Sequence, residues 1–165
     1  MNKEKQMGKM EDDRFFLLRT IKIAIKGIKK GRGPFSALVV KDRKIISKAN
    51  NKVVVSHDPT AHAEVLAIRK ASFLLKTHDL SDCVLYTSCE PCPMCLGAIY
   101  WSGIKKIVYA SDRNDAERSG FSDKLIYDEI GIEPAKRKIE FIRITDAGGE
   151  KVFEKWDNFE DKIPY

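Results

Sequence analysis

Apolar residues recur at three- and four-residue steps along the first part of the chain. Between Glu11 and Lys30, lysine and arginine hold many of the other positions, and the apolar residues stand at Phe15, Leu18, Ile21, Ile25 and Ile28. This spacing places them on one face of a helix, so it predicts an amphipathic helix over residues 11–30. The sequence Gly31-Arg32-Gly33-Pro34 predicts where that helix ends.

The pattern then changes to short apolar runs separated by turn residues. Residues 35–41 and 44–50 predict the two strands of a hairpin, with a tight turn at Asp42-Arg43. Two further buried strands are predicted over 83–87 and 106–110, and two helices over 61–76 and 91–101. A hairpin followed by alternating strands and helices is typical of one α/β domain with a mixed sheet between helices.

The last third of the chain has a weaker pattern. We expect a polar loop over 111–120, a short helix over 122–130, a strand over 139–144 and a terminal helix over 152–159. The chain ends in Lys162-Ile163-Pro164-Tyr165, which places apolar and aromatic residues at a terminus that is usually polar.

Composition narrows the class of protein. A chain of 165 residues and 18.8 kDa, with 43% hydrophobic and 33% charged residues, has the size of one domain and enough apolar material for one core. The apolar runs are far shorter than the roughly 20 residues of a membrane span, and no apolar segment follows the charged N-terminus. We therefore expect a cytoplasmic protein with no membrane helix, no signal peptide and no membrane partner.

The net charge of +6 is unevenly distributed. Residues 1–48 hold 14 Lys and Arg against 5 Asp and Glu, so this part of the chain is strongly basic. Such a surface attracts nucleic acid or phosphates, or it is simply a solvated lysine-rich face. No aromatic residue interleaves with the basic residues between Lys22 and Arg32, so a stacking platform for single strands is not visible there.

Candidate metal ligands stand in two short segments. His62-Ala63-Glu64 opens one predicted helix, and Cys92 and Cys95 lie one helical turn apart at the start of another. Two thiolates and an imidazole suit zinc, and three protein ligands leave the fourth position for a water whose pKa the ion lowers. A carboxylate beside that water, here Glu64, can carry protons. Together the two segments match the His-x-Glu…Pro-Cys-x-x-Cys pattern of zinc deaminases.

The cysteines allow three other interpretations. A structural zinc site of His62, Cys89, Cys92 and Cys95 would leave Glu64 without a role. A thioredoxin-like redox pair would leave His62 and Glu64 unused. An iron–sulfur cluster would need a further cysteine after Cys95, and the sequence has none.

The segments Asp58–Glu64 and Cys89–Ile99 resemble the cytidine and deoxycytidylate deaminase superfamily, and most closely its purine branch of bacterial guanine deaminases and tRNA adenosine deaminases. Ser88-Cys89-Glu90, Ile99-Tyr100-Trp101, the segment 116–130 and the terminal Tyr165 resemble the guanine deaminases. The resemblance implies a three-layer α/β/α domain over 11–165 with a five-stranded mixed sheet. Residues 1–10 fall outside it and are expected to be a flexible extension.

The resemblance also implies a role for each site residue. His62, Cys92 and Cys95 would hold one zinc ion, and Glu64 would shuttle protons. Asn50 would grip the base edge, although Asn51 beside it leaves the assignment open by one position. The other implied contacts are the ring faces of Phe35 and Trp101, the backbone amide of Ala63, the carboxylate of Asp123 as a second proton carrier, and Tyr165 from a partner subunit. Ser122 departs from the family pattern, where a second acidic residue is expected.

The implied function is hydrolytic deamination of guanine to xanthine and ammonia, with zinc and no organic cofactor. The implied partners are a purine base and a second copy of the chain, in a homodimer that exchanges C-terminal segments (about 145–165). Alternatives are deamination of tRNA adenosine to inosine, which would require nucleic-acid binding, and deamination of guanosine or another aminated purine. A more remote alternative is a non-catalytic zinc-binding interaction domain.

Overall fold

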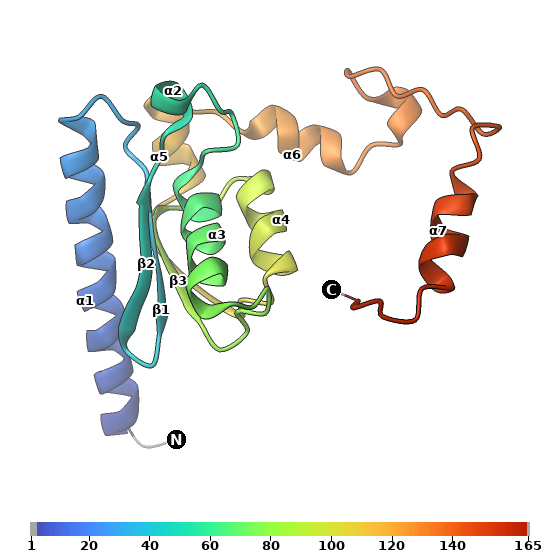
Figure 1. Cartoon of the computed structure of the whole chain (residues 1–165). Coiled ribbons are helices and arrows are strands. Elements are labelled where there is room, and N and C mark those ends of the chain that lie inside the picture. The colour runs from blue at the N-terminus through green and yellow to red at the C-terminus, as the bar shows by residue number, and fades with distance from the viewer. Residues whose placement is uncertain (1–2, 165) are drawn as a thin grey trace. The chain divides into compact units, whose positions relative to one another are not determined.

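The computed structural model describes the backbone of residues 3–164 and the side chains of residues 10–164. By its internal contacts the chain divides into two compact units, Met1–Asp123 and Lys124–Tyr165. The first unit contains all the described strands (Figure 1).

A four-stranded mixed sheet forms the centre of the first unit, in the order β2-β1-β3-β4. Its strands are β1 (Ser36–Lys41), β2 (Lys44–Asn50), β3 (Val84–Cys89) and β4 (Lys106–Ser111). Strand β1 pairs antiparallel with both β2 and β3, and β4 pairs parallel with β3. The predicted hairpin is confirmed, and both of its turn residues, Asp42 and Arg43, have positive φ, as a tight two-residue turn requires.

Helices cover both faces of this sheet, so the predicted three-layer α/β/α arrangement is confirmed. Helix α1 (Lys3–Ile28) buries Phe16 against Leu38, Val40 and Tyr86 on one face. Helices α3 (Ala63–Leu75) and α4 (Pro93–Trp101) cover the other face. There Ala37, Val39 and Leu85 pack with apolar residues of both helices (Figure 1). Because successive strand residues point to opposite faces, β1 supplies both cores.

Helix α1 is longer than its apolar pattern predicts. It begins at Lys3, so the backbone of residues 3–10, which we expected to be a flexible extension, continues the helix. Near this end the Tyr86 hydroxyl donates to Asp13 Oδ1 over 2.7 Å, and Lys106 pairs with the same carboxylate at 2.6 Å. These contacts fix the amino-terminal half of α1 to β3 and β4.

Two expectations for the sheet and its loops are wrong. The sheet has four strands among the described residues rather than five, because residues 139–144 have no strand partner and their apolar side chains are exposed. The segment expected as a polar loop contains α5 (Arg113–Arg118), which a reciprocal capping box between Asp112 and Asp115 starts. One turn of helix, α2 (Val53–Ser56), lies in the loop after β2.

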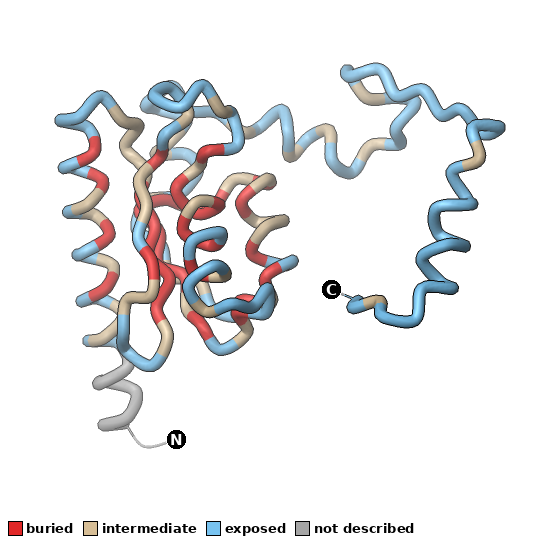
Figure 2. The backbone as a smooth tube through the Cα atoms, viewed as in Figure 1, coloured by how far each residue is buried: buried red, intermediate tan, exposed pale blue. Residues whose placement is uncertain are grey.

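The second unit consists of short helices joined by irregular segments: α6 (Lys124–Ile130), the 3₁₀ turn η1 (Pro134–Lys136) and α7 (Glu150–Asp157). Both predicted helices are present with shifted bounds. None of its described residues is buried (Figure 2), and Ile142 and Phe153 are 75% and 71% exposed. Among the described residues, no helix combines the length and the apolar character that crossing a membrane requires.

Candidate metal centre

The direction of the strands brings several loops to one edge of the sheet. Strands β2, β3 and β4 run in the same direction and β1 runs against them, so the ends of those three strands lie beside the start of β1. The segments at this edge include Phe35, Asn51 and the Cys89–Cys92 loop. Hydrogen bonds join them: Asn51 N donates to Phe35 O over 2.9 Å, and Ser36 N donates to Ser88 Oγ over 3.1 Å.

Two helices begin at this edge, and the residue that precedes each is a predicted metal ligand. His62 is the N-cap of α3 and Cys92 is the N-cap of α4, both with extended backbone dihedral angles. Pro93 follows Cys92 as the first residue of α4, where its missing N–H costs nothing. Cys95 lies three residues after Cys92, on the same side of the first helical turn.

The three predicted ligand atoms converge. His62 Nδ1 lies 3.5 Å from the sulfur of Cys92 and 3.5 Å from the sulfur of Cys95. All three atoms lie within 4.8 Å of one another. With Zn–S near 2.3 Å and Zn–N near 2.0 Å, a tetrahedral ion separates its sulfur and nitrogen ligands by about 3.5 Å. The donor set and its spacing therefore fit zinc, with one coordination position left open.

The protonation of the two thiols favours metal binding at this point. Hydrogen bonds from Cys95 and His62 lower the pKa of Cys92 to about 4, although burial of the thiol opposes this. The same hydrogen bond to Cys92 and burial raise the pKa of Cys95. One sulfur is thus a ready thiolate at the positive end of α4, and zinc would displace the proton from the other.

Cys89 is not part of this group. It is buried, its thiol donates to Asp112 O over 3.4 Å, and burial raises its pKa to about 11. Among the described side chains the potential metal ligands form one group, which contains His62, Cys92 and Cys95. This arrangement argues against the four-ligand structural site that the sequence left open.

Glu64 lies beside the ligands but outside the ligand set. Its carboxyl is 4% exposed, and Thr87 Oγ1 donates to its Oε1 over 2.5 Å. Its other oxygen, Oε2, accepts from the Cys95 thiol over 3.5 Å. Burial raises the pKa of Glu64, and the bond from Thr87 opposes that shift. The carboxyl therefore has one oxygen fixed and the other directed toward the metal ligands.

Thr87 is a residue that the sequence analysis did not single out. It is fully buried within β3 and can orient Glu64 through the hydrogen bond described above. Threonine is common in strands, so a single sequence carries no signal that separates this residue from an ordinary strand position.

Asp123 is half-buried, and burial raises its pKa. The negative charge of Cys92 raises this pKa further, so the carboxyl lies within electrostatic range of the metal ligands. Phe35 packs edge-to-face on Phe121, with ring centroids 4.9 Å apart. Ala63 is fully buried as the first residue of α3, where a backbone N–H has no partner within the helix.

The two remaining predicted substrate contacts are Trp101 and Tyr165. Trp101 is 71% exposed at the end of α4. Tyr165 lies outside the described residues. The structure therefore brings His62, Glu64, Cys92 and Cys95 together. The roles of Asp123, Trp101 and Tyr165 stay predictions.

The two neighbouring asparagines have different surroundings. Asn50 Nδ2 donates to Ile23 O over 2.9 Å and its Oδ1 accepts from Arg32 over 3.4 Å, so this amide is directed toward α1. Asn51 is 9% exposed, and its Oδ1 accepts from Val53 N over 3.1 Å. Its Nδ2 donates to no side chain or backbone atom that the structure describes. Asn50 thus uses one of its two side-chain N–H groups for Ile23 O, whereas within the described residues Asn51 uses neither.

The sequence matches a known family model. Residues 10–111 match the cytidine and deoxycytidylate deaminase zinc-binding region, and this span contains the three metal ligands and Glu64. The chain belongs to this family. It is 49% identical to guanine deaminase of Bacillus subtilis over 151 residues, which cover 91% of this chain and 97% of that enzyme. The crystal structure of the Bacillus subtilis enzyme covers all of this chain and 99% of its own, with a TM-score of 0.89.

Other members of the family resemble a smaller part of the chain. A structure solved in complex with 2,6-diaminopurine is 38% identical, with a TM-score of 0.61, and covers 65% of this chain and 60% of its own. A tRNA-specific adenosine deaminase of Aquifex aeolicus is 43% identical over 97 residues, 59% of this chain and 64% of that enzyme.

We predict that two cysteine variants will separate the ligand set from its surroundings. Cys92→Ser removes a thiolate and should lose most of its zinc to a mild chelator, because a serine hydroxyl is a poor zinc ligand. Cys89→Ser keeps a hydroxyl that can donate to Asp112 O and should retain about one zinc per chain. Metal analysis by mass spectrometry of both purified proteins measures this. Equal zinc loss in the two variants would instead indicate a structural zinc site with four protein ligands, of which Cys89 is one.

Proposed function

We propose that this protein catalyses the hydrolytic deamination of guanine to xanthine and ammonia. The observation that carries the proposal is Glu64, a buried carboxyl held by Thr87 beside a three-ligand metal centre. A structural zinc site has no use for such a group, whereas a deaminase needs a proton carrier there. Similarity to a guanine deaminase over almost the whole chain supports guanine as the substrate.

The chain's own residues divide the chemistry between them. His62, Cys92 and Cys95 would hold zinc, which supplies an activated water when it is bound. Glu64 would take a proton from that water and deliver it to the substrate, while Thr87 keeps its other oxygen fixed. Asp123 would accept a hydrogen bond from the exocyclic amine and help it leave as ammonia. The net change adds water, breaks the bond between C2 and the amine, and leaves a carbonyl.

The experiment that tests the activity measures ammonia release from guanine, guanosine, 2,6-diaminopurine, cytosine and an adenosine-containing tRNA anticodon stem-loop. We expect the highest kcat/KM for guanine. Glu64→Gln should keep its zinc and lose about 10³-fold in kcat, because the amide has similar size but cannot carry the proton. Inosine formation in the stem-loop without guanine turnover would contradict the proposal and favour a tRNA deaminase.

We further propose that Asn51, rather than Asn50, contacts the base edge. Ser47 and Ala49 of β2 contact α3 or pack in the core that α3 covers, so strand alternation directs Asn51 toward the same face and Asn50 toward α1. Asn51 also lies next to Phe35 through its backbone hydrogen bond. An amide with a free donor at this point can both donate to and accept from a purine.

Substitution of the two asparagines should give opposite results. Asn51→Asp keeps the acceptor for Val53 N but removes the donor and adds charge, so we expect kcat/KM for guanine to fall about 10²-fold. Asn50→Asp makes the same chemical change one residue away and should stay within about threefold of the parent. Steady-state kinetics at equal zinc content decide this, and the reverse order would return the role to Asn50.

The oligomeric state is the second part of the proposal: a homodimer that exchanges C-terminal segments. The second unit exposes apolar side chains that a stable surface would cover, including Ile139, Phe141, Ile142, Val152, Phe153 and Trp156. In the first unit β4 is an edge strand, and Tyr100 and Trp101 are also exposed.

All four cysteines are free thiols, which is consistent with a reducing, cytoplasmic location.

A complementation experiment tests the exchange. One chain carries Glu64→Gln with an intact tail, and the other has Glu64 but lacks residues 163–165. If the tail of one chain closes the other chain's site, each protein alone should have less than about a tenth of the parent activity, and refolding them together should restore turnover. The parent should sediment as a dimer. A monomer, or a mixture as inactive as its parts, would contradict the exchange and leave the zinc chemistry intact.

A further inference from the structure

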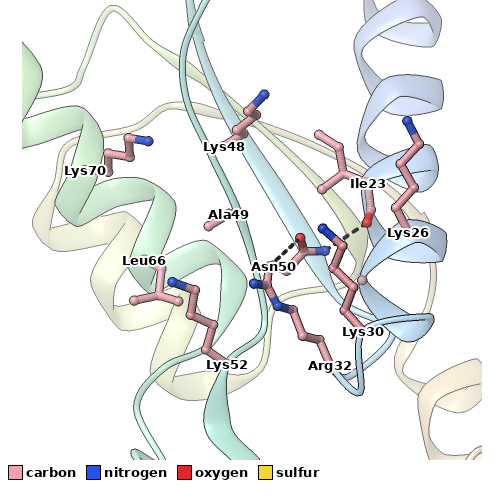
Figure 3. Close-up of a pocket in the computed structure, with 11 residues that line it drawn as sticks. Ile23, Lys26, Lys30, Arg32, Lys48, Ala49, Asn50, Lys52, Leu66 and Lys70 are labelled. Atoms are coloured by element: carbon pink, nitrogen blue, oxygen red, sulfur yellow. Dashed lines mark hydrogen bonds between the residues drawn. The ribbon is translucent and has the colours of Figure 1, made fainter. Parts of the chain in front are cut away.

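A basic groove lies between α1, β2 and α3. It has a volume of about 550 Å³, and Figure 3 shows its side chains arranged around Asn50. Its cationic lining residues are Lys26, Lys30, Arg32, Lys48, Lys52 and Lys70. An adjoining hollow of about 500 Å³ shares Lys26, Lys48 and Lys70 and adds Arg19 and Lys22. We call the two together the basic groove.

The positive charge of the basic groove is not neutralised within the described part of the chain. No aspartate or glutamate lines either hollow, and none of the eight cations forms an ion pair with a side chain in residues 10–164. Lys22 and Lys26 lie one turn apart on α1, a spacing at which like charges destabilise a helix, and Lys30 follows in the turn after the helix. A surface that served only solubility would mix the two signs of charge.

The floor of the groove is built around Asn50. Its amide links Ile23 O of α1 to the Arg32 guanidinium, which holds that cation at the groove wall. Gly27 permits this contact, because a Cβ there would stand 2.6 Å from Asn50 Nδ2. A guanidinium held in one place, with lysines around it, suits an anion that carries several phosphate oxygens.

The lining also limits the chemistry of the ligand. Its apolar side chains are aliphatic, Ile23, Ile45, Ile46, Ala49 and Leu66, and no aromatic residue lines either hollow. Single-stranded nucleic acids are bound on aromatic side chains that stack with bases, so this groove lacks their usual platform. Its volume suits a small molecule of nucleotide size.

We propose that the basic groove binds a small polyphosphate anion through its phosphates. The anion is either a free inorganic polyphosphate or the phosphate chain of a nucleoside triphosphate. The site is separate from the metal centre, since none of its lining residues is a metal ligand, and its Asn50 is directed toward α1 rather than toward those ligands. The two sites share α3, whose first residues lie at the metal centre and whose Leu66 and Lys70 line the groove. They also adjoin after β2, where Asn50 and Lys52 line the groove on either side of Asn51.

The test is calorimetric titration of the zinc-loaded full chain with inorganic tripolyphosphate and with ATP, at about 50 mM salt. We expect one site per chain and competition between the two ligands. The triple variant Lys26→Gln, Lys48→Gln, Lys70→Gln removes one cation from each of α1, β2 and α3 and should bind at least about tenfold more weakly. Zinc content is measured before and after each titration, because polyphosphates also chelate metals.

A matched control separates a built site from net charge. The triple variant Lys44→Gln, Lys76→Gln, Lys105→Gln makes the same change of charge at exposed positions outside the groove and should bind within about threefold of the parent. Equal weakening in the two triple variants would overturn the proposal. So would an absence of tripolyphosphate binding, or tight binding of tRNA that tripolyphosphate does not displace.

Discussion

The metal ligands meet because β2, β3 and β4 run in one direction, so the chain leaves all three strands at the same edge of the sheet. His62 and Cys92 are 30 residues apart, yet each is the cap of a helix that starts at this edge. Helix starts offer unpaired N–H groups and a positive dipole end, which stabilise thiolate and carboxylate. The strand directions thus place anionic ligands where the backbone already favours negative charge. This is also the edge at which α/β sheets bind their ligands.

The same geometry places a second acidic group, the Glu64 carboxyl, in a buried region where a negative charge is energetically unfavourable. A thiolate at Cys92 and a carboxyl at Glu64 lie in the same buried region. Burial raises the pKa of Glu64, and the hydrogen bond to Cys92 together with burial raises the pKa of Cys95. A divalent cation at the open centre of the ligand set would offset both negative charges. Thr87 meanwhile keeps the Glu64 carboxyl in one orientation. The affinity for the metal and the charge of the Glu64 carboxyl therefore depend on the same electrostatic interactions.

Much of the first unit was predictable from apolar spacing, because each helix and strand there buries a face against a neighbour that the chain itself supplies. The strand expected over 139–144 is absent for the opposite reason: its apolar residues have no sheet partner among the described residues and are exposed. Helix α5 was missed because a polar capping box, not an apolar stripe, starts it. The ligands and Glu64 were predictable because the His-x-Glu and Cys-x-x-Cys spacings are those that a zinc site with a neighbouring carboxylate needs. Thr87 belongs to no such motif.

The pair Asn50-Asn51 shows where sequence reasoning is limited by a single residue. In a strand, a shift of one position moves a side chain to the other face. Asn50 is thereby directed toward α1, where it secures Arg32 in the basic groove, and Asn51 toward the face that α3 covers. Two identical side chains at adjacent positions therefore lie on opposite faces of the sheet. The sequence identifies the two amides, but the register of β2 against β1, with Ser36 opposite Asn50, determines which of them is directed toward α1 and which toward the face that α3 covers.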